Sequence, residues 1–488
     1  MAKGNFIDGR WRLASGRGFS STDPADGAQI WQGNGSASSD VNAAFLAAKN
    51  AFESWAETSL ENRSEIVLRF KELALASKDK LGELIARETG KVIWDASGEA
   101  GAVAGKVDIS LKSYADRTGC STTQTAFGRA DLQHRPHGVM AVLGPYNFPA
   151  HLPNGQIIPA LIAGNTVVFK PSEQCPAVGE FLVGLYEQAG FPPGVINMVQ
   201  GARDTGTAIL DHPNVDGVLF TGAAGTGKFI HEKFGGRPEI VLALELGGNN
   251  PLLLWDVEDT QAAASIIVQS AFITSGQRCT CARRILLPQG KAGDAVLDAV
   301  VAMAESMKVG AWNDFLHSDG KEAFIGPVIS ADIAAHVVER SHKLGGHVIR
   351  QTEIMERGPA FIRPGIIDVT GVQVPDEEIF GPVMQIIRVP SLEAGIVEAN
   401  NTKFGLSAGL ISDNPKNWDL FRRKIRAGVV NFNRPTTGAA GFLPFGGPGA
   451  SGNHSPGAYY AADFCAWPMA SQIADTVEVQ PAKGLSTC

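Results

Sequence analysis

The sequence predicts an α/β protein built around a doubly wound, parallel sheet. From residue 139 onwards, short apolar runs of strand length alternate with longer helical stretches, and most of the runs end in Gly or Pro. Such alternation is typical of a parallel sheet with helices on both faces. The chain of 488 residues is too long for one ordinary core, so we expect two or three domains. The strand-like runs are VMAVLGP, NTVVFKP, VINMVQG, GVLFTG and IVLALELGG.

Composition excludes several classes of function. Apolar residues make up 44% of the chain and charged residues 19%, as in soluble globular proteins. The net charge of −8 argues against a general attraction to nucleic acid or to anionic membranes. The N-terminus is polar from its first residues, and no apolar run approaches the roughly 18 residues of a membrane-spanning helix. Six cysteines are too sparse for a disulfide framework, so we expect a reducing, cytoplasmic setting.

The elements before the sheet can be predicted in chain order. Asp8-Gly9 is a favoured two-residue hairpin turn between short strands. Apolar residues over 41–55 recur at spacings of three and four, which predicts an amphipathic helix with Ser39 or Asp40 as its cap. Two further helical segments follow this helix.

A second α/β region runs from about Asn249 to about Phe442. Its apolar segments predict helices at 260–275 and 294–308. The polar stretch 117–136 lies between helix and sheet, and we expect it to project from the first domain. No internal repeat or long linker appears in the sequence, so we expect the domains to pack tightly.

The stretch TSGQRCTCARR holds two cysteines, Cys279 and Cys281, separated by one residue. A tetrahedral zinc site needs a second Cys or His pair, and none of the ten histidines forms a spaced pair near a cysteine. The gap also differs from the two-residue gap of a thioredoxin-type motif. The residues alone leave a metal site and a redox pair open, but they favour one reactive thiol beside a bystander, with no metal.

Two strand ends carry residues suited to a nucleotide. The run GVLFTGAAGTGKFI places Gly222, Gly225 and Gly227 between a strand and a helix, where glycines let backbone approach a ligand closely. The spacing differs from the dinucleotide fingerprint, so a tight turn without a ligand fits equally well. After the run TVVFK, Lys170 and Glu173 suit ribose hydroxyls, and Glu173 would repel the 2′-phosphate of NADP. A solvated loop with a helix-capping serine is the alternative.

Two further residues suit chemistry at a carbonyl carbon. Glu245 lies in an apolar strand-like run, where burial raises the pKa of a carboxyl group toward the range of a general base. Asn147, held between Pro145 and Pro149 at a strand end, can donate its amide to a developing oxyanion. Glu245 could instead be an exposed residue on a strand of alternating polarity, and Asn147 could serve only to stabilise the turn between the two prolines. With a cysteine nucleophile and a nicotinamide hydride acceptor, the two residues complete the roles needed to oxidise and release an acyl group.

Over nearly its whole length, the chain resembles the aldehyde dehydrogenase superfamily. The shared motifs occur in family order, and chance agreement of all of them is negligible. They are GPYNFP, FKPSE, FTGAAGTG, LELGGNNP, GQRC, EEIFGPV, FGLSAGL and PFGGPGASG. The resemblance implies a Rossmann-type NAD-binding domain, an α/β catalytic domain and a small β oligomerisation flap. It also implies NAD as the cofactor, an aldehyde substrate, and a homodimer or homotetramer.

The resemblance assigns roles to the site residues. It makes Cys279 the nucleophile and Glu245 the general base. The amide of Asn147 and the backbone N–H of Cys279 become the oxyanion donors, whereas Cys281 becomes a pocket-wall or packing residue.

The resemblance also places the cofactor along the strand ends. Lys170 and Glu173 match residues that hold the adenosine ribose, and Glu378 and Phe380 match those at the nicotinamide-side ribose and ring. Two alanines in the glycine-rich turn replace a common serine contact. Asn249 stands where the family commonly has a lysine, which puts a structural ion pair in doubt. The expected cofactor-binding residues are Lys170, Ser172, Glu173, Gly222, Ala223, Ala224, Gly225, Thr226, Gly227, Glu378 and Phe380.

The expected domain boundaries follow from the same resemblance. They are 1–116 and 138–246 for the NAD-binding domain, 247–443 for the catalytic domain, 117–137 and 466–488 for the flap, and 444–465 for an anchor loop that returns to the NAD-binding domain.

Three longer stretches carry a narrower resemblance: HRPHGVMAVLGPYNFPAHLPNGQIIPALIAGNT, TSGQRCTCARRILL and GASGNHSPGAYYAADFCAWPMAS. They resemble the branch of the family that oxidises N-succinylglutamate 5-semialdehyde in arginine breakdown. Guanidinium groups suit the carboxylates of so anionic an aldehyde, and Arg278 directly precedes the cysteine nucleophile. Ser451 and His454 lie in a glycine-rich loop that could bind a carboxylate. Arg283 and Arg284 open an apolar strand, where solvated or structural roles fit equally well.

Other functions stay open at this point. The same machinery could oxidise succinate or glutamate semialdehyde, or it could pass an acyl group to coenzyme A. Glu245 argues against acyl transfer to coenzyme A, because a general base at this site would activate water for hydrolysis. The presence of Asn147, Glu245 and Cys279 together argues against a catalytically silent binding protein.

Overall fold

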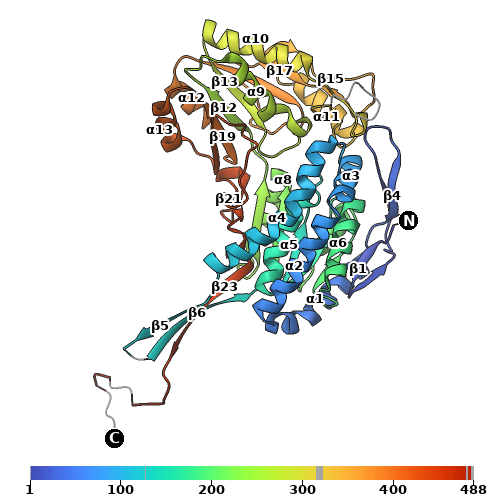
Figure 1. Ribbon diagram of the computed structural model, residues 1–488, viewed down its shortest axis with the longest axis vertical. Coiled ribbons are helices and arrows are strands. Elements are labelled where there is room, and N and C mark those ends of the chain that lie inside the picture. Colours follow the sequence, from blue (N-terminus) through green and yellow to red (C-terminus); the bar gives the residue numbers. More distant parts are fainter. Residues whose placement is uncertain (1, 127, 315–321, 480–481, 485–488) are drawn as a thin grey trace.

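The computed structural model confirms the predicted α/β class. Two seven-stranded sheets, each packed between helices, form the lower and upper lobes in Figure 1. A three-stranded sheet forms an arm that projects from the lower lobe. The structure describes residues 2–126, 128–314, 322–479 and 482–484.

The sheet of the lower lobe has the predicted parallel core. Its strands run in the order β11 (Val241–Leu246), β10 (Gly217–Gly222), β7 (Val139–Leu143), β8 (Thr166–Lys170), β9 (Ile196–Met198), β1 (Asn5–Ile7) and β2 (Arg10–Arg12). The strands from β11 to β9 pair in parallel, and the predicted hairpin adds β1 and β2 antiparallel at one edge. Parallel pairing aligns the carboxyl ends of β7, β8, β10 and β11 along the edge where such sheets bind ligands.

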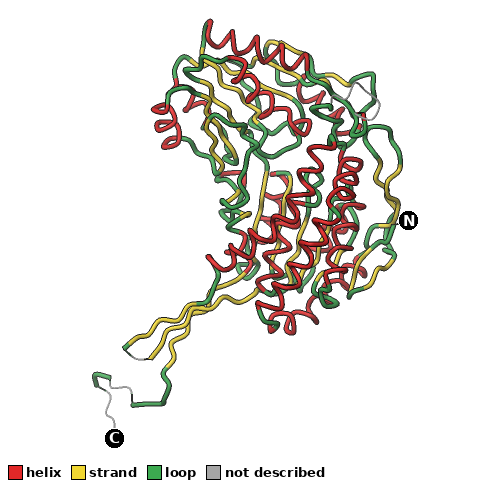
Figure 2. The backbone as a smooth tube through the Cα atoms, in the orientation of Figure 1, coloured by secondary structure: helices red, strands yellow, loops and turns green. Residues whose placement is uncertain are grey.

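Helices cover both faces of this sheet, and alternate residues of one strand show why. The helices are α1 (Ser38–Glu57), α2 (Leu60–Ala76), α3 (Lys78–Thr89), α4 (Ile93–Arg117), α5 (His151–Ala163), α6 (Pro176–Ala189), α7 (Arg203–Leu210) and α8 (Ala224–Phe234). In β7, Met140 and Val142 pack into the core formed with α2 to α6, whereas Ala141 and Leu143 pack with α1, α7 and α8. Figure 2 shows the long helices stacked against the strands.

The first predicted helix forms as α1, but the prediction of its cap was wrong. The helix begins at Ser38, so Ala37 is the cap residue, and Ser39 and Asp40 lie inside the first turn. Asp40 still serves the helix end, because its carboxylate accepts the backbone N–H of Ala37 at 2.9 Å. A carboxylate here also interacts favourably with the positive end of the helix dipole.

The sheet of the upper lobe repeats the parallel arrangement. Its order is β14 (His347–Arg350), β17 (Gly365–Asp368), β18 (Val383–Val389), β13 (Ala282–Pro288), β12 (Asn250–Leu254), β19 (Ser407–Ile411) and β20 (Val429–Phe432), with only β14 antiparallel among these described strands. Its helices are α9 (Thr260–Phe272), α10 (Lys291–Ser306), α11 (Ala331–His342), α12 (Leu392–Ala399) and α13 (Pro415–Lys424). The helices predicted at 260–275 and 294–308 thus form as α9 and α10. After α9 the chain tightens into a 3-10 turn at Ile273–Gly276.

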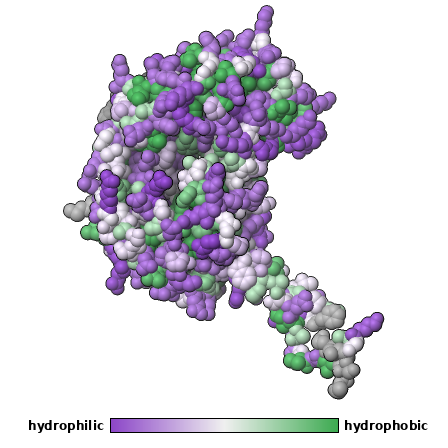
Figure 3. Space-filling model, turned by 180° about the vertical axis from the view of Figure 1, so that it is seen from behind, coloured by the Kyte–Doolittle hydropathy of each residue, from purple (hydrophilic) through white to green (hydrophobic). Residues whose placement is uncertain are grey.

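The arm joins two distant parts of the chain. It consists of β5 (Ser121–Thr125), β6 (Gly128–Pro136) and β23 (Ala466–Ile473), paired antiparallel in the order β23-β6-β5. All residues of β5 are exposed, and Figure 3 shows the arm standing clear of the body. The predicted flap includes residues 127, 480–481 and 485–488, which lie outside the described residues. The domain boundaries themselves stay a prediction.

Shorter strands and one helix complete the described chain. They are β3 (Gly18–Thr22), β4 (Gln29–Asn34), β15 (Glu353–Ile354), β16 (Ile362–Arg363), β21 (Pro444–Phe445), β22 (Gly457–Ala458) and α14 (Ala461–Cys465). None of the helices in the described ranges combines the length and the hydropathy needed to cross a membrane.

Candidate active site

A cavity of about 1450 Å³ opens where the carboxyl ends of the lower sheet meet loops of the upper lobe. Its volume exceeds the roughly 300–1,000 Å³ of a typical small-ligand pocket, so it can hold a dinucleotide and a second molecule together. Cys279, Glu245 and Asn147 all line this cavity, although they come from three separate segments of the chain. The fold therefore brings the three predicted catalytic side chains to one site.

Cys279 follows a strained turn at the end of α9. Thr274 and Ser275 have φ angles of 56° and 55°, in the left-handed region that is costly for residues other than glycine. The surroundings hold this turn in place. The hydroxyl of Ser275 donates to the carbonyl of Gly326 at 2.6 Å, and Nε of Arg278 donates to the hydroxyl of Thr274 at 2.8 Å. These contacts fix the direction in which the chain carries Cys279 into the cavity.

The surrounding side chains favour the neutral thiol of Cys279. Burial first, and then the carboxylates of Glu378 and Glu245, raise the pKa of this thiol to about 12. At neutral pH the thiol is therefore protonated, and the proton must leave before the sulfur can attack a carbonyl carbon. Cys281 is fully buried outside the cavity wall, and its Sγ lies 3.8 Å from the carbonyl oxygen of Ile273. Of the two roles expected for Cys281, its surroundings support the packing role.

Glu245 lies on β11 and has one free carboxylate oxygen. Its Oε1 accepts the backbone N–H of Gly457 at 2.7 Å, while its Oε2 is buried and has no hydrogen-bond partner among the described residues. Burial raises the pKa of the carboxyl group to about 8, opposed by the hydrogen bond from Gly457 and by the ammonium of Lys106. A buried, unpartnered oxygen with a pKa near neutrality fits a general base and not a solvated glutamate.

We expect the turnover number to rise with pH through the pKa of Glu245. Below about 8 the carboxyl group is protonated and cannot take a proton from water, whereas above it the carboxylate predominates. A kcat limited by this base should fall about tenfold per pH unit on the acid side. Steady-state kcat from about pH 6 to about pH 10 measures the effect. A flat profile on the acid side would contradict the role of Glu245.

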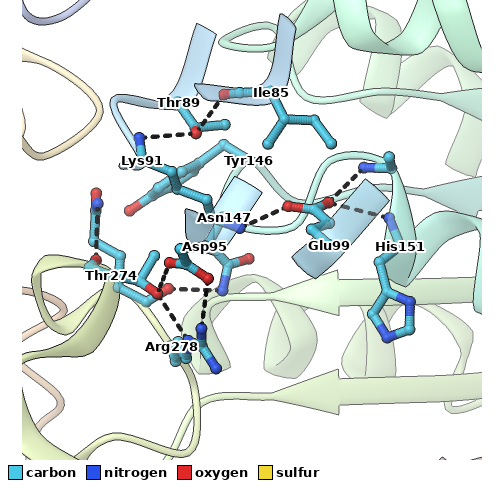
Figure 4. A network of polar contacts seen from close by, with 12 residues as sticks. Ile85, Thr89, Lys91, Asp95, Glu99, Tyr146, Asn147, His151, Thr274 and Arg278 are labelled. Carbon is cyan, nitrogen blue, oxygen red and sulfur yellow. Dashed lines mark hydrogen bonds and ion pairs between the residues drawn. The ribbon is translucent and has the colours of Figure 1, made fainter. Parts of the chain in front are cut away.

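Asn147 connects the first sheet to the cysteine loop. It follows β7, is 7% exposed, and donates one amide hydrogen to the carbonyl of Gln277 at 2.9 Å. A side-chain amide has two donor hydrogens, so the second remains for a ligand at the thiol. Figure 4 shows Asn147 among the polar groups that surround this loop.

A buried polar face of α4 supports the site, and sequence reasoning missed it. Oδ1 of Asp95 accepts the Arg278 guanidinium at 2.7 Å, and Oε2 of Glu99 pairs with the Lys91 ammonium at 2.6 Å (Figure 4). Oε1 of Glu99 also accepts two backbone N–H groups at the start of α5. Asp95, Glu99 and Lys106 recur at helical spacing, so they share one face of α4. That spacing of charged residues was the sequence signal that could have identified this polar face.

The glycine-rich turn after β10 opens the start of α8 to the cavity. Ala223 is the cap residue and has no polar side chain, so the first N–H groups of the helix stay available for an anion. A Cβ at Gly225 would meet no atom within 4 Å. At Gly222 or Gly227, a Cβ would collide with side chains of β10 and β11. Two of the three predicted glycines are thus required by the packing of the protein itself.

Lys170, Ser172 and Glu173 lie at the end of β8, on the same sheet edge but outside the cavity wall. The Lys170 ammonium donates to two backbone carbonyls at 2.7 and 2.8 Å and lies 3.5 Å from the carboxylate of Glu173. Thr226 is exposed and also lies outside the wall. The contacts of these four residues with a cofactor stay a prediction.

Glu378 and Phe380 reach the cavity from the loop before β18. Oε1 of Glu378 pairs with Arg283 at 3.0 Å, and the Phe380 ring stands edge-on to Tyr146 with 6.1 Å between the ring centroids. Gly247 lies against the carboxylate, since a Cβ there would be 1.9 Å from Oε2 of Glu378. The ion pair and the glycine together fix the position of this carboxylate.

The three residues expected to meet substrate carboxylates lie in different surroundings. Arg278 lines the cavity, but its guanidinium is paired with Asp95, which offsets its charge. Ser451 is fully buried, and its hydroxyl is committed to two backbone groups. His454 is exposed on a left-handed turn outside the cavity wall. The expectation of direct substrate contacts from Ser451 and His454 therefore needs correction, because neither side chain reaches the cavity.

Comparison with known proteins agrees with this geometry. The model of the aldehyde dehydrogenase family matches residues 11–467. The chain belongs to the aldehyde dehydrogenase family. Its curated relatives include the N-succinylglutamate 5-semialdehyde dehydrogenase of Caulobacter sp. (strain K31), 52% identical over 98% of both chains. The protein of the same name from Burkholderia mallei (strain SAVP1) is 52% identical over 96% of both chains.

Solved structures share the fold of this aldehyde dehydrogenase. An NAD-dependent aldehyde dehydrogenase from Sinorhizobium meliloti superposes with a TM-score of 0.91 at 26% identity, covering 100% of this chain and 97% of the other. A Mycobacterium tuberculosis aldehyde dehydrogenase complexed with NAD+ has a TM-score of 0.89 at 26% identity, covering 98% and 99%.

One departure from the family pattern has a structural answer in this aldehyde dehydrogenase. Asn249 stands at the usual lysine position, and its side-chain N–H donates to the carboxylate of Asp376 at 2.9 Å. A hydrogen bond therefore replaces the ion pair. Arg283 and Arg284 are buried and donate mainly to backbone carbonyls. Their roles are therefore structural, as one of the two sequence interpretations proposed.

Replacing Gly247 by alanine should weaken cofactor use by this aldehyde dehydrogenase. The added Cβ would lie 1.9 Å from Oε2 of Glu378, so the carboxylate must leave its position. We expect KM for NAD to rise at least about tenfold, the factor that about 1.4 kcal/mol of lost binding produces. Gly98→Ala is the control, because a Cβ at Gly98 meets no atom within 4 Å. Equal KM values for the two variants would argue against a cofactor contact of Glu378.

Proposed function

We propose that this aldehyde dehydrogenase oxidises N-succinyl-L-glutamate 5-semialdehyde to N-succinyl-L-glutamate with NAD and water, in the succinyltransferase route of arginine catabolism. The observation that carries the chemistry is the single cavity shared by Cys279, Glu245 and Asn147. The substrate is supported by the names of relatives that are 52% identical over nearly the whole chain.

The thiol and the carboxylate divide the reaction between them. Sγ of Cys279 loses its proton to solvent water and attacks the aldehyde carbon to form a thiohemiacetal. The free amide hydrogen of Asn147 and the backbone N–H of Cys279 donate to the oxyanion. Loss of hydride from the thiohemiacetal carbon leaves a thioester on Cys279, and NAD, when bound, would supply the hydride acceptor. Glu245 then takes a proton from the water that attacks the thioester carbon, which releases the carboxylate product and the thiol.

The residues of the cavity fit an NAD cofactor. The free N–H groups at the start of α8 suit a pyrophosphate, and the carboxylate of Glu378 suits a ribose hydroxyl. Phe380 supplies an apolar surface in the cavity that Cys279 also lines. The Glu173 side chain is 48% exposed at the end of β8, where it would repel an added 2′-phosphate and so favours NAD over NADP.

A steady-state comparison of purified aldehydes tests the proposal. We expect kcat/KM for N-succinylglutamate semialdehyde to exceed the values for succinate semialdehyde, glutamate semialdehyde and hexanal, and to be higher with NAD than with NADP. A preference for a shorter anionic semialdehyde would select the alternative substrate on the same machinery. A value for hexanal equal to that for the succinylated substrate would remove the anionic class altogether.

We also infer that the chain assembles into a homodimer or homotetramer through the arm. β5 forms the edge of the arm sheet, its side chains are all exposed, and Trp467 on β23 is 42% exposed. An exposed strand edge pairs readily with another chain. Light scattering on the purified protein distinguishes the two assemblies from a monomer. The cytoplasmic location stays a prediction, and the five described cysteines are free thiols, in keeping with it.

A further inference from the structure

Lys106 is a buried cation on the cavity wall without a counter-ion in contact. It lies on α4, is 6% exposed, and lines the cavity that holds Cys279. Among the described residues, its ammonium makes no hydrogen bond and no ion pair. Burial lowers the pKa of Lys106 to about 8, opposed by the more distant charge of Glu245, so the ammonium form predominates at neutral pH. A buried charge is costly unless it is paired, so this ammonium lacks the partner that its burial requires.

The other cations of the cavity wall are already paired or solvated. Arg278 pairs with Asp95 at 2.7 Å, and Arg340 pairs with Glu377 at 2.7 Å. Lys228 and Lys403, which also line the cavity, are exposed to solvent. Among the cations of the described cavity wall, Lys106 is therefore the one that is buried and has neither a hydrogen-bond partner nor an ion-pair partner.

The chain leaves space for the head group of Lys106. Gly155 on α5 faces it, and a Cβ there would lie 3.0 Å from Cε and 3.5 Å from Nζ of Lys106. One turn earlier on α5, His151 also lines the cavity, and its Nδ1 is buried without a hydrogen-bond partner among the described residues. Burial, and then the Lys106 charge, lower the pKa of His151 to about 3, so this ring is neutral. The Lys106 ammonium is thus the positive charge in this part of the cavity wall.

We propose that the ammonium of Lys106 binds a carboxylate of the aldehyde substrate and so selects anionic aldehydes over neutral ones. The inference rests on the proposed function and deepens it, because it names the side chain that recognises the charge of the substrate. A carboxylate would supply the counter-ion that no described residue provides at this position. Glu245 does not fill this role, because its Oε1 is held by Gly457 and its Oε2 makes no contact with the ammonium.

The competing explanation is that Lys106 acts only through Glu245. The ammonium lowers the pKa of this carboxyl group, and that effect reaches every substrate alike. A role in substrate recognition changes KM for anionic aldehydes alone, whereas a role through Glu245 changes kcat and its pH profile for all aldehydes. The two explanations therefore separate in one set of measurements.

Lys106→Met removes the charge but keeps an unbranched side chain of similar length. We expect kcat/KM for N-succinylglutamate semialdehyde to fall at least about 30-fold, mainly through KM, as when one partner of a buried charge pair is removed. For hexanal we expect a change of less than about threefold, within the range of a lost packing contact. Lys112→Met is the matched control, because Lys112 lies on the same helix and its side chain is 67% exposed.

Several outcomes would overturn the assignment. They are an equal loss for hexanal and the anionic substrate, an unchanged KM for the anionic substrate, or a shifted acid limb of kcat for both aldehydes. Lys106→Gln repeats the test with a neutral polar group, and loss of the fold in both variants would make the ammonium a structural group. A wild-type enzyme inactive on every anionic aldehyde would instead refute the proposed function. If the wild type and Lys106→Met both preferred the anionic aldehyde to hexanal, the proposed function would stand and this inference alone would be refuted.

Discussion

Replacing Cys279 by alanine should lower both aldehyde oxidation and ester hydrolysis by at least about 10⁴-fold, the loss typical of a removed nucleophile. In the proposed mechanism, both reactions need a sulfur atom that attacks a carbonyl carbon in the cavity, and Cys279 is the cysteine that lines it among the described residues. The residue is only partly buried, so the substitution should leave the thermal midpoint nearly unchanged. NADH formation and hydrolysis of a chromogenic ester measure the two activities on the same protein.

Cys281→Ala is the matched control for this experiment. Cys281 is fully buried, so its truncation should cost about 1 kcal/mol of stability through lost packing. Its sulfur lies outside the cavity wall, so both activities should persist. If activity survived in Cys279→Ala and vanished in Cys281→Ala, the nucleophile would have to be reassigned. Mass spectrometry of a trapped acyl adduct would then locate it directly.

Replacing Glu245 by glutamine should allow one turnover and stop the second. The glutamine keeps an oxygen that can accept the N–H of Gly457, but it cannot take a proton from water. The first thioester should therefore form and release one equivalent of NADH, while hydrolysis slows by about 10²- to 10⁴-fold. Stopped-flow recording of NADH should show a burst followed by a slow phase, and the acyl group should remain on Cys279.

The control for this variant is Glu239→Gln, a substitution at an exposed glutamate in the loop before β11. It removes the same charge within the same segment of chain, so normal turnover is expected. Absence of a burst in Glu245→Gln, with NAD binding intact, would show that Glu245 is needed before the thioester forms. The assignment of Glu245 to the hydrolytic step alone would then be wrong.

The sequence predicted the parts of this protein that depend on local patterns. Alternating strands and helices gave the α/β class, and the motifs around Asn147, Glu245 and Cys279 identified side chains that the fold brings to one cavity. Their ionisation could not be predicted in the same way. The pKa of Cys279 depends on burial and on Glu378, which lies 99 residues further along the chain and meets the thiol only in the folded protein.

Other parts of the site were hidden because they depend on contacts between distant residues. Arg278 was expected to serve the substrate, but its partner Asp95 lies on α4 and approaches only through the packing of the two lobes. Ser451 suited a carboxylate by residue type, yet its loop packs its hydroxyl against backbone groups. The burial of Lys106 could not be predicted, because a lysine in a helix is ordinarily solvated, and Gly155 on α5 approaches it only in the folded protein.

α4 connects the cavity wall at Lys106 to the arm. Its 25 residues extend for about 37 Å as one continuous rod, with Lys106 near the middle. At its far end Nε of Arg117 donates to Asp463 at 2.7 Å, and the chain enters β5 four residues later. A displacement of this far end of α4 is therefore carried along a single helix to the lysine. If the chain assembles through the arm as proposed, we expect contacts between subunits to restrict the movement of Lys106 as well.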